Sequence, residues 1–314
     1  MFNTPILLVT FNRPDLTKLV FEVIKKVQPR KLYISSDGPR KNNSSDLKKI
    51  TEVRSIFDEI DWHCEVNQLY QSGNLGCSFG PIEAFNWFFS FENEGIILED
   101  DCLPHIDFFY YCQILLEKYR ENNKILNICG SNMGFHYNLD SSYFYSRFMN
   151  MSGWATWKRS VILIDYDITN WKNTKNKKFN SYKLLRQSIF DLDIGWYQYW
   201  YDKFNKTIND KNISWWDWQW IYHQLKHRQL SIVPTKNLVT NIGFDEMATH
   251  TRDPSNPAAN IPSESFRFPL IHPLKIAPNF KYEEHIKWVW CYYKRLPFMF
   301  YIKRYVSKVL GRII

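Results

Sequence analysis

Short strand-like runs alternate with helical segments over the first hundred residues, and this alternation limits the fold more than any other feature. The runs at 5–11, 31–35, 64–70 and 95–98 have the length of strands and are separated by turn residues or by helical patterns. Strands that alternate with helices predict an α/β fold, with a mostly parallel sheet and helices on its faces.

Apolar spacing and helix-starting residues also place the helices. We expect them at 16–27, 44–57, 81–91, 107–120 and 215–227, with a further strand at 125–129. Three other segments are expected to be irregular: a turn of small and aromatic residues at 153–157, a surface loop at 170–180 and a long loop at 241–264.

The composition is that of a globular protein with a large core. Of the 314 residues, 45% are hydrophobic and 23% are charged. The 18% aromatic content includes 13 Trp, and Trp and Tyr suit sugar-binding clefts as well as cores. The six cysteines form no CxxC pair, which argues against a zinc ribbon or a thioredoxin motif. Neither a secretory signal nor a bilayer-length apolar run is evident, so we expect a cytoplasmic protein.

Positive charge is concentrated towards the C-terminal end. Residues 281–314 contain eight Lys or Arg and two acids, whereas the other 280 residues contain 32 basic and 30 acidic side chains. A basic, aromatic, amphipathic helix suits an anionic membrane surface, which would make the protein peripheral at the inner face of the membrane. A helix packed on the domain with its basic face in solvent fits equally well. No nucleic-acid-binding motif accompanies the charge, so we expect no nucleic-acid partner.

Three acidic residues, Glu99, Asp100 and Asp101, directly follow the predicted strand at 95–98. Ligands of open α/β sheets gather at the carboxyl ends of strands, and alternation along the chain gives Glu99 and Asp101 a shared direction. Neighbouring carboxylates repel one another unless a cation or donors balance them, and oxygen ligands favour Mg²⁺ or Mn²⁺. The sequence therefore predicts a divalent-metal site here, with a solvated acidic turn as the alternative.

Seven short motifs occur in an order that resembles a known family. They are Pro5–Arg13, Tyr33–Gly38, Leu98–Asp101, Phe108–Phe109, Gly153–Trp154, Trp216–Trp218 and Asn241–Phe244. Together they resemble the GT-A glycosyltransferases, in particular the Golgi N-acetylglucosaminyltransferase that begins complex N-glycans and bacterial nucleotide-diphospho-sugar transferases. The resemblance touches most of residues 5–250. It implies a Rossmann-like GT-A fold, to which the chain adds a helical basic C-terminal tail.

The resemblance assigns a role to each matching residue. Arg13 and Asp37 match positions that hold the nucleotide, with Asp37 near the uracil. Asp100 matches a contact to the ribose, and Glu99 matches a contact to the donor sugar. Asp101 matches the residue that ligates the metal.

Asp217 matches the catalytic base, although the Golgi enzyme has two adjacent acids where this chain has Trp216 and Asp217. A helix N-cap is the alternative role for Asp217. Further candidates have equally ordinary structural roles in turns, loops or the core. They are Thr10, Asn12 and Asn74 for the nucleotide, Trp154 for the donor sugar and His250 for the metal.

These roles imply a metal-dependent, inverting glycosyltransferase that uses Mn²⁺ or Mg²⁺. It would move a sugar from a nucleoside diphosphate, UDP by the resemblance, to a glycan hydroxyl in bacterial surface polysaccharide or glycoconjugate synthesis. The basic tail suggests that the acceptor is lipid-linked. We expect residues 1–102 to form the nucleotide-sugar half, 103–280 the acceptor and catalytic half of the same domain, and 281–314 the tail.

Three other functions compete with this interpretation. A sugar nucleotidyltransferase usually carries a glycine-rich basic loop after the first strand, and residues 10–14 contain no glycine. A non-catalytic binding protein at the membrane surface would have no need of Asp101 and Asp217. A metal-dependent hydrolase would require more His or Asp ligands than the sequence offers.

Overall fold

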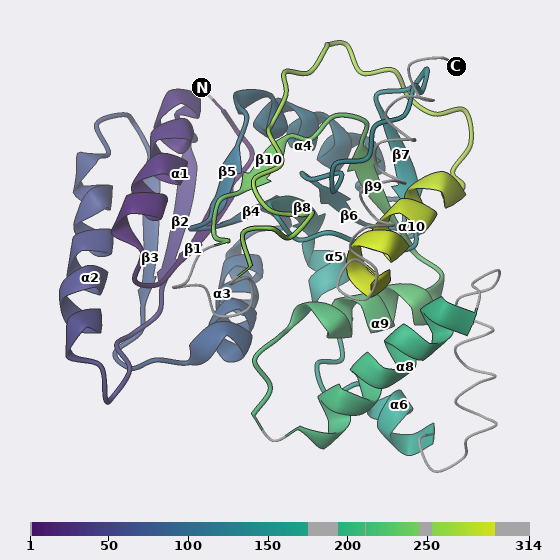
Figure 1. Cartoon of the computed structure of the whole chain (residues 1–314). Helices are drawn as coiled ribbons and strands as arrows, with labels where there is room; N and C mark the ends of the chain where they lie inside the picture. Colours follow the sequence, from purple (N-terminus) through teal and green to yellow (C-terminus); the bar gives the residue numbers. More distant parts are fainter. Residues whose placement is uncertain (1, 175–193, 211, 245–252, 293–314) are drawn as a thin grey trace.

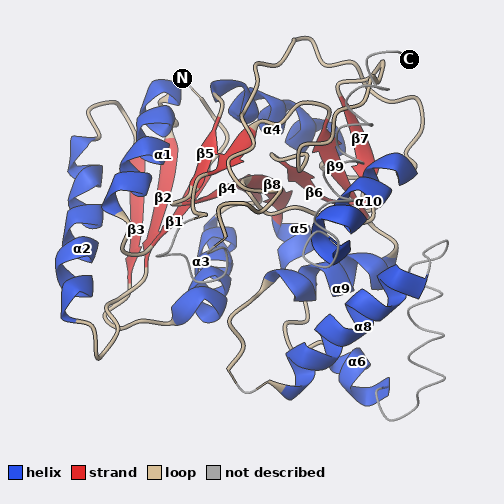
Figure 2. Ribbon diagram, viewed as in Figure 1, coloured by secondary structure: helices blue, strands red, loops and turns tan. Residues whose placement is uncertain are grey.

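The computed structural model describes residues 2–174, 194–210, 212–244 and 253–292. Within these ranges an eight-stranded sheet is flanked by helices (Figures 1 and 2). The expected α/β class, a mostly parallel sheet between helices, is confirmed and is consistent with a Rossmann-like GT-A fold.

The strands of the large sheet follow the order β3-β2-β1-β4-β8-β6-β9-β7, and a separate pair joins β10 to β5. Strands β3, β2, β1 and β4 are parallel, β8 runs antiparallel to its neighbours β4 and β6, and β7 runs antiparallel to β9. The strand bounds are β1 Ile6–Thr10, β2 Lys31–Ser36, β3 Glu65–Tyr70, β4 Glu94–Glu99, β5 Cys102–Pro104, β6 Ile125–Cys129, β7 Tyr143–Ser146, β8 Trp154–Trp157, β9 Leu230–Pro234 and β10 Val239–Asn241.

Helices cover both faces of the sheet. Their bounds are α1 Pro14–Val27, α2 Ser44–Ser55, α3 Gly76–Phe91, α4 Ile106–Tyr119, α5 Lys158–Val161, α6 Thr169–Thr174, α8 Ile194–Asn209, α9 Asp217–His227 and α10 Phe280–Lys287, with a 3₁₀ helix η1 at Ile56–Glu59 and a π-helix η2 at Trp288–Tyr292. In Figure 1, α4 lies above the sheet, and α3, α5 and α9 lie below it.

The period-two alternation of strand residues builds two cores. In β1, Ile6 and Leu8 join the apolar cluster that includes α1 and α4, whereas Leu7 joins the cluster that includes α3, α8 and α9. In β4, Ile96 and Ile97 divide between the clusters in the same way. Since the strands are buried on both faces, they read as continuous apolar runs in the sequence.

The predicted elements of the first 130 residues are all present, with one substantial difference. Helix α3 begins at Gly76, whereas the sequence predicted a helix from Pro81. The prediction was wrong because it relied on the glycines and the proline. The carboxylate of Asp37, from a distant strand end, accepts the amides of Leu75 and Gly76 and fixes the start of the helix earlier.

The expected turn at 153–157 was also wrong, because Trp154–Trp157 forms β8 in the middle of the sheet. Gly153 precedes the strand and has a φ of +64°, a left-handed conformation that glycine adopts without steric cost. The loop expected at 170–180 was wrong for residues 170–174, which belong to helix α6, and residues 175–180 lie outside the described part. In the expected loop at 241–264, residues 245–252 lie outside it as well.

The described part of the basic tail is helical and packs on the domain. Tyr282 and Ile286 of α10 are buried, and the buried Glu283 pairs with Arg147 after β7 and accepts its backbone amide at 2.8 Å. Residues 293–314 lie outside the described part, so the expected helical tail is observed only up to η2. Within the described residues, no helix has both the length and the apolar character needed to cross a bilayer.

Candidate active site

The carboxyl ends of β1, β2 and β4 meet at one edge of the sheet, because these strands are parallel neighbours. Arg13 follows β1, Asp37 follows β2, and Asp100 and Asp101 follow β4. Up to 88 positions separate these residues in the sequence. The topology nevertheless brings Arg13 within hydrogen-bond distance of Asp100 and Asp101.

Arg13 ties the acidic residues to the first loop. Its Nη2 donates to Oδ1 of Asp100 at 2.6 Å and to Oδ2 of Asp101 at 3.0 Å. The amide of Phe11 donates to the second oxygen of Asp100 at 3.1 Å. Burial raises the pKa of Asp100 to about 6, although Arg13 acts in the opposite sense. An arginine thus balances part of the repulsion that the sequence implied.

The guanidinium is itself stabilised by this arrangement. Burial alone would lower the pKa of Arg13, but the charges of Asp100 and Asp101 outweigh burial and hold that pKa above its usual value. Arg13 therefore remains a fixed cation at the end of β1.

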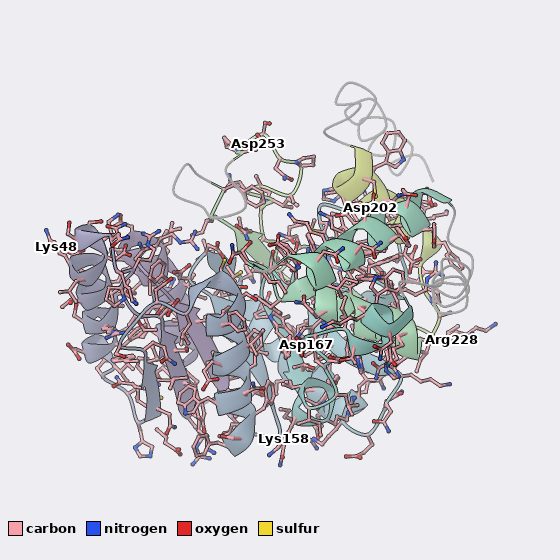
Figure 3. All side chains as sticks on the ribbon, turned by 90° about the horizontal axis from the view of Figure 1, so that it is seen from below. Lys48, Lys158, Asp167, Asp202, Arg228 and Asp253 are labelled. Atoms are coloured by element: carbon pink, nitrogen blue, oxygen red, sulfur yellow. The ribbon has the colours of Figure 1, made fainter. Side chains whose placement is uncertain are left out.

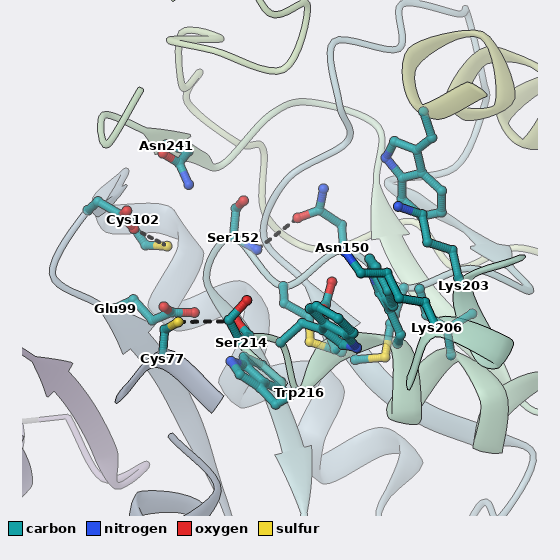
Figure 4. A pocket seen from close by; sticks show the side chains of 18 of the residues that line it. Cys77, Glu99, Cys102, Asn150, Ser152, Lys203, Lys206, Ser214, Trp216 and Asn241 are labelled. Atoms are coloured by element: carbon teal, nitrogen blue, oxygen red, sulfur yellow. Dashed lines mark hydrogen bonds between the residues drawn. The ribbon is translucent and has the colours of Figure 1, made fainter. Parts of the chain in front are cut away.

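Glu99 is half-buried, and its carboxylate points into the space beside the strand end (Figure 4). Burial, together with the neighbouring charges of Asp101 and Asp100, raises its pKa to about 8, although Arg13 acts in the opposite sense. The charge of Asp217 also raises this pKa, because Asp217 faces the same space.

Asp37 is occupied with holding the loop before α3. Its carboxylate accepts the amides of Gly38 at 2.8 Å, Leu75 at 2.8 Å and Gly76 at 3.0 Å, and the side-chain amide of Asn74 at 2.9 Å. The contacts of Asp37 and Asn74 thus position a loop, and their nucleotide roles remain predictions.

Two other predicted nucleotide residues also contact the framework. The hydroxyl of Thr10 donates to the carbonyl of Ser35 at 3.1 Å, and the side-chain amide of Asn12 donates to Asp46 at 2.8 Å. Asp46 is fully buried and also accepts Nε of Arg40 at 2.6 Å, which lowers the pKa of Asp46 to about 2. Of the predicted nucleotide residues, Arg13 alone is among the described residues that line the cavity beside this edge.

That cavity has a volume of about 650 Å³, which lies within the range of small-molecule sites. Four residues chosen from the sequence line it together: Arg13, Glu99, Asp101 and Asp217. Figure 4 shows Glu99 and Cys102 on one side, Lys203 and Lys206 on the other, and Trp216 and Asn150 between them. The fold therefore joins the strand edge of the first half to helices of the second half in one site.

Asp217 is the first residue of α9 and lines the cavity. The N-cap position belongs to Trp216, so the alternative role of Asp217 as a helix N-cap was wrong. The first turn of a helix favours negative charge. The rings of Trp215 and Trp218 lie 4.3 Å apart on either side of it in sequence and also line the cavity, which places the carboxylate in an aromatic setting.

Trp154 lies in the core rather than at the cavity. Its side chain is 0% exposed, and its ring stacks on Trp216 at 5.8 Å and meets Trp220 edge-on at 5.0 Å. A sugar would reach Trp154 only if Trp216 moved, so we regard Trp216 as the better candidate for the sugar contact that the sequence assigned to Trp154.

Sequence reasoning missed α8 and its contribution to the site. Tyr199, Lys203 and Lys206 line the cavity from this helix, and Trp200 lines it as well. The signal was present as an i, i+4, i+7 spacing of Tyr199, Lys203 and Lys206, with a buried row of Trp196, Trp200 and Phe204 beside it. Because aromatic residues occur on both faces of α8, the periodicity did not stand out.

The residues at the acidic edge fit a divalent cation that takes most of its ligands from the substrate and from water. Asp101 and Glu99 offer hard oxygens to the same cavity. No group of three or more His, Cys, Asp or Glu in the described residues is arranged to hold a metal ion by itself. Mg²⁺ commonly binds through one or two carboxylates together with substrate phosphates and water, and this pattern suits the site. His250 lies outside the described residues.

Comparisons with known proteins give only weak structural similarities. No protein-family model and no curated protein matches the sequence significantly. Similar solved structures include HddC from Yersinia pseudotuberculosis, at 10% identity over 51% of this chain and 78% of that one, with a TM-score of 0.30.

A mannosyltransferase from Pyrobaculum calidifontis in complex with GDP-Man and Mn²⁺ matches at 10% identity, over 49% of this chain and 44% of that one, with a TM-score of 0.32. A cytidylyltransferase from Leptospira borgpetersenii matches at 10% identity, over 52% and 64%, with a TM-score of 0.32. These neighbours include both glycosyltransferases and nucleotidyltransferases. Because their TM-scores are low, we argue the function of this chain from its site.

Proposed function

We propose that the chain is a glycosyltransferase that takes a sugar from a nucleoside diphosphate, with UDP as the first candidate, and transfers it to a glycan hydroxyl. The observation that carries this proposal is the shared cavity of Arg13, Glu99, Asp101 and Asp217. It combines a cation and carboxylates at a strand edge with a separate carboxylate on a facing helix.

In the proposed reaction, the acceptor oxygen forms a bond to the anomeric carbon of the donor sugar while the bond from that carbon to the diphosphate breaks. The electron pair leaves with the nucleoside diphosphate. Asp217 takes the proton of the attacking hydroxyl as general base. Attack from the side opposite the leaving group inverts the anomeric centre.

Arg13 and Glu99 act at the donor side in this proposal. Arg13 holds Asp101 in place and adds positive charge near the departing diphosphate. Glu99 faces the cavity beside Asp101 and contacts the donor sugar. Asp101, with Glu99 beside it, would hold Mn²⁺ or Mg²⁺. When bound, such an ion supplies Lewis-acid stabilisation of the diphosphate.

A nucleotidyltransferase would bind its nucleotide at the same sheet edge. An experiment can distinguish that function from glycosyl transfer. We would measure the thermal stability of the full chain with UDP, GDP, dTDP and their sugars, with and without Mn²⁺, in the wild type, Asp101→Ala and Asp167→Ala. Asp167 is an exposed control (Figure 3). A ligand that binds only the folded state raises the melting temperature.

The proposal expects a Mn²⁺-dependent shift with one nucleotide, lost in Asp101→Ala and kept in Asp167→Ala, and release of nucleoside diphosphate from the matching sugar nucleotide. Exchange of pyrophosphate into a nucleotide sugar would instead establish a nucleotidyltransferase. If no nucleotide raises the melting temperature of the wild type, the proposal is wrong.

We further propose that the acceptor is lipid-linked and that the basic tail holds the enzyme at the inner face of an anionic membrane. Residues 293–314 contain six Lys or Arg and no acid. Such a segment is attracted to anionic lipid headgroups.

A further inference from the structure

The cavity wall opposite the acidic edge is cationic and aromatic. From α8, the ammonium of Lys203 lies 4.2 Å from the ring centroid of Trp218 and 5.2 Å from that of Tyr199. The ammonium of Lys206 lies 4.7 Å from the ring centroid of Trp215. All five residues line the cavity, so two cations are fixed on aromatic faces at one end of it.

The contact of Lys206 with Trp215 leaves ammonium donors of Lys206 available to a ligand. A cation over an aromatic ring is attracted to the π face, but an ammonium has three N–H donors and a ring face occupies only part of them. Within the described residues, Lys206 forms no ion pair with a carboxylate. An anionic group on a ligand would therefore find a cation whose charge is not already neutralised there.

A buried indole lies in the same wall. Trp200 lines the cavity and its side chain is 1% exposed, with its Nε1 enclosed by the protein. The donors that this wall offers to a ligand are therefore ammonium groups, which suit an oxyanion.

We infer that Lys203 and Lys206 bind an anionic group, a phosphate or a carboxylate, on the acceptor. This inference rests on the proposed glycosyltransferase function and names its acceptor class: a sugar that carries negative charge. Trp215 and Trp218 pack against each other beside the two lysines and line the same wall of the cavity.

The place of the lysines in the cavity favours the acceptor over the donor. Lys203 and Lys206 lie across the cavity from Glu99 (Figure 4). Asp217, the proposed base, follows α8 at the start of α9 and lines the same cavity. The acidic edge with Arg13 serves the donor diphosphate, so the lysine wall is left for the molecule whose hydroxyl Asp217 deprotonates.

The test measures binding by intrinsic tryptophan fluorescence of the full chain, which requires no turnover. The probes are glucose 1-phosphate, glucuronate, citronellyl phosphate and neutral glucose. The variants are Lys203→Met/Lys206→Met, Lys203→Arg/Lys206→Arg and the control Lys48→Met. Lys48 is an exposed lysine of α2 at the far end of the molecule from Asp202 of α8 (Figure 3).

We expect an anionic sugar to bind the wild type at least about tenfold more tightly than glucose, since a hydrogen bond to a charged group contributes roughly 1.5–3 kcal/mol and 1.4 kcal/mol is a factor of ten. The double Met variant should lose this preference, and the Arg variant and Lys48→Met should keep it. The probe that binds identifies the source: a phosphosugar, an acidic sugar, or a prenyl phosphate whose anion belongs to the lipid.

Equal binding of glucose and its anionic relatives, or an unchanged double Met variant, would overturn the inference. Loss of the nucleotide-induced thermal shift in the double Met variant would also overturn it, because the lysines would then hold the donor diphosphate. A wild type that shows lysine-dependent anion binding and no nucleotide shift would support the anion site and refute the proposed function, so the two failures are distinguishable.

Discussion

The backbone of Gly243 lies directly against the side chain of Asp101: a Cβ on Gly243 would be 2.7 Å from Cβ of Asp101. The neighbouring amide of Ile242 donates to the carbonyl of Asp101 at 2.9 Å, so the two segments are also joined through the backbone. The segment after β10 thereby fixes the carboxylate that we propose as metal ligand.

Gly243→Ala should displace Asp101, because the added methyl group would lie 2.2 Å from Oδ2 and 2.7 Å from Cβ of Asp101, and Cβ can move only with the backbone. We expect loss of the Mn²⁺-dependent thermal shift with nucleotide. Gly73→Ala is the matched control, since nothing lies within 4 Å of the added methyl group. If Gly243→Ala binds donor as the wild type does, Asp101 is not the metal ligand.

Arg13→Met should destabilise the fold by about 3 kcal/mol, because it leaves the buried Asp100 carboxylate without its cation. Urea unfolding measures the change. Combining Arg13→Met with Asp100→Asn should recover part of the loss, because the unpaired charge is removed. A double variant as unstable as the sum of the single variants would show that the pair does not interact.

Asp217→Asn should lower kcat by a factor of about 10²–10⁴, the usual contribution of a general base, and leave donor binding unchanged. The measurement is steady-state transfer together with the nucleotide-induced thermal shift. Asp202→Asn, on the exposed face of α8, is the control and should retain activity. A fall in donor affinity without a fall in kcat would assign Asp217 to binding.

His223→Gln should reduce the loss of stability in acid. Burial lowers the pKa of His223 to about 4, with the charges of His227 and Lys226 acting in the same direction. Between about pH 6.5 and pH 4 the unfolded chain binds a proton that the folded chain excludes, so His223 destabilises the fold as the pH falls through this window, by up to about 1.4 kcal/mol per pH unit.

Glu99 and Asp100 have the opposite effect on stability, because their raised pKa values mean that the folded chain binds their protons more readily than the unfolded chain as the pH falls. The relevant quantity is therefore the difference in unfolding free energy between the wild type and His223→Gln across pH 4–7. His63→Gln, at an exposed position, is the control. A difference that does not change with pH would mean that His223 is protonated in the folded protein.

Truncation after Tyr292 should abolish binding to vesicles that contain anionic lipid and leave the melting temperature nearly unchanged, because Tyr282, Glu283 and Ile286 of α10 are retained. Sedimentation with anionic and with neutral vesicles, at low and at high salt, measures the binding. Unchanged binding of the truncated chain to anionic vesicles would exclude residues 293–314 as the membrane contact.

The sequence was sufficient for elements whose signal is local. Strand β4 is a continuous apolar run followed by three acids, and α1 repeats apolar residues after Pro14, so both were predicted close to their observed bounds. Strand β8 was missed because Trp154–Trp157 is short, and its extended form depends on pairing with β4 and β6 on either side.

The candidate site divides in the same way. The sequence by itself determined which residue types could carry the chemistry: a carboxylate cluster at a strand end, and Asp217 among tryptophans. Only the tertiary structure decided what each carboxylate contacts. Asp37 is saturated by donors from the loop before α3, Asp100 is bound by Arg13, and Glu99 is left facing the cavity. The physical reason is that hydrogen-bond partners and desolvation come from residues distant in sequence, which no local pattern records.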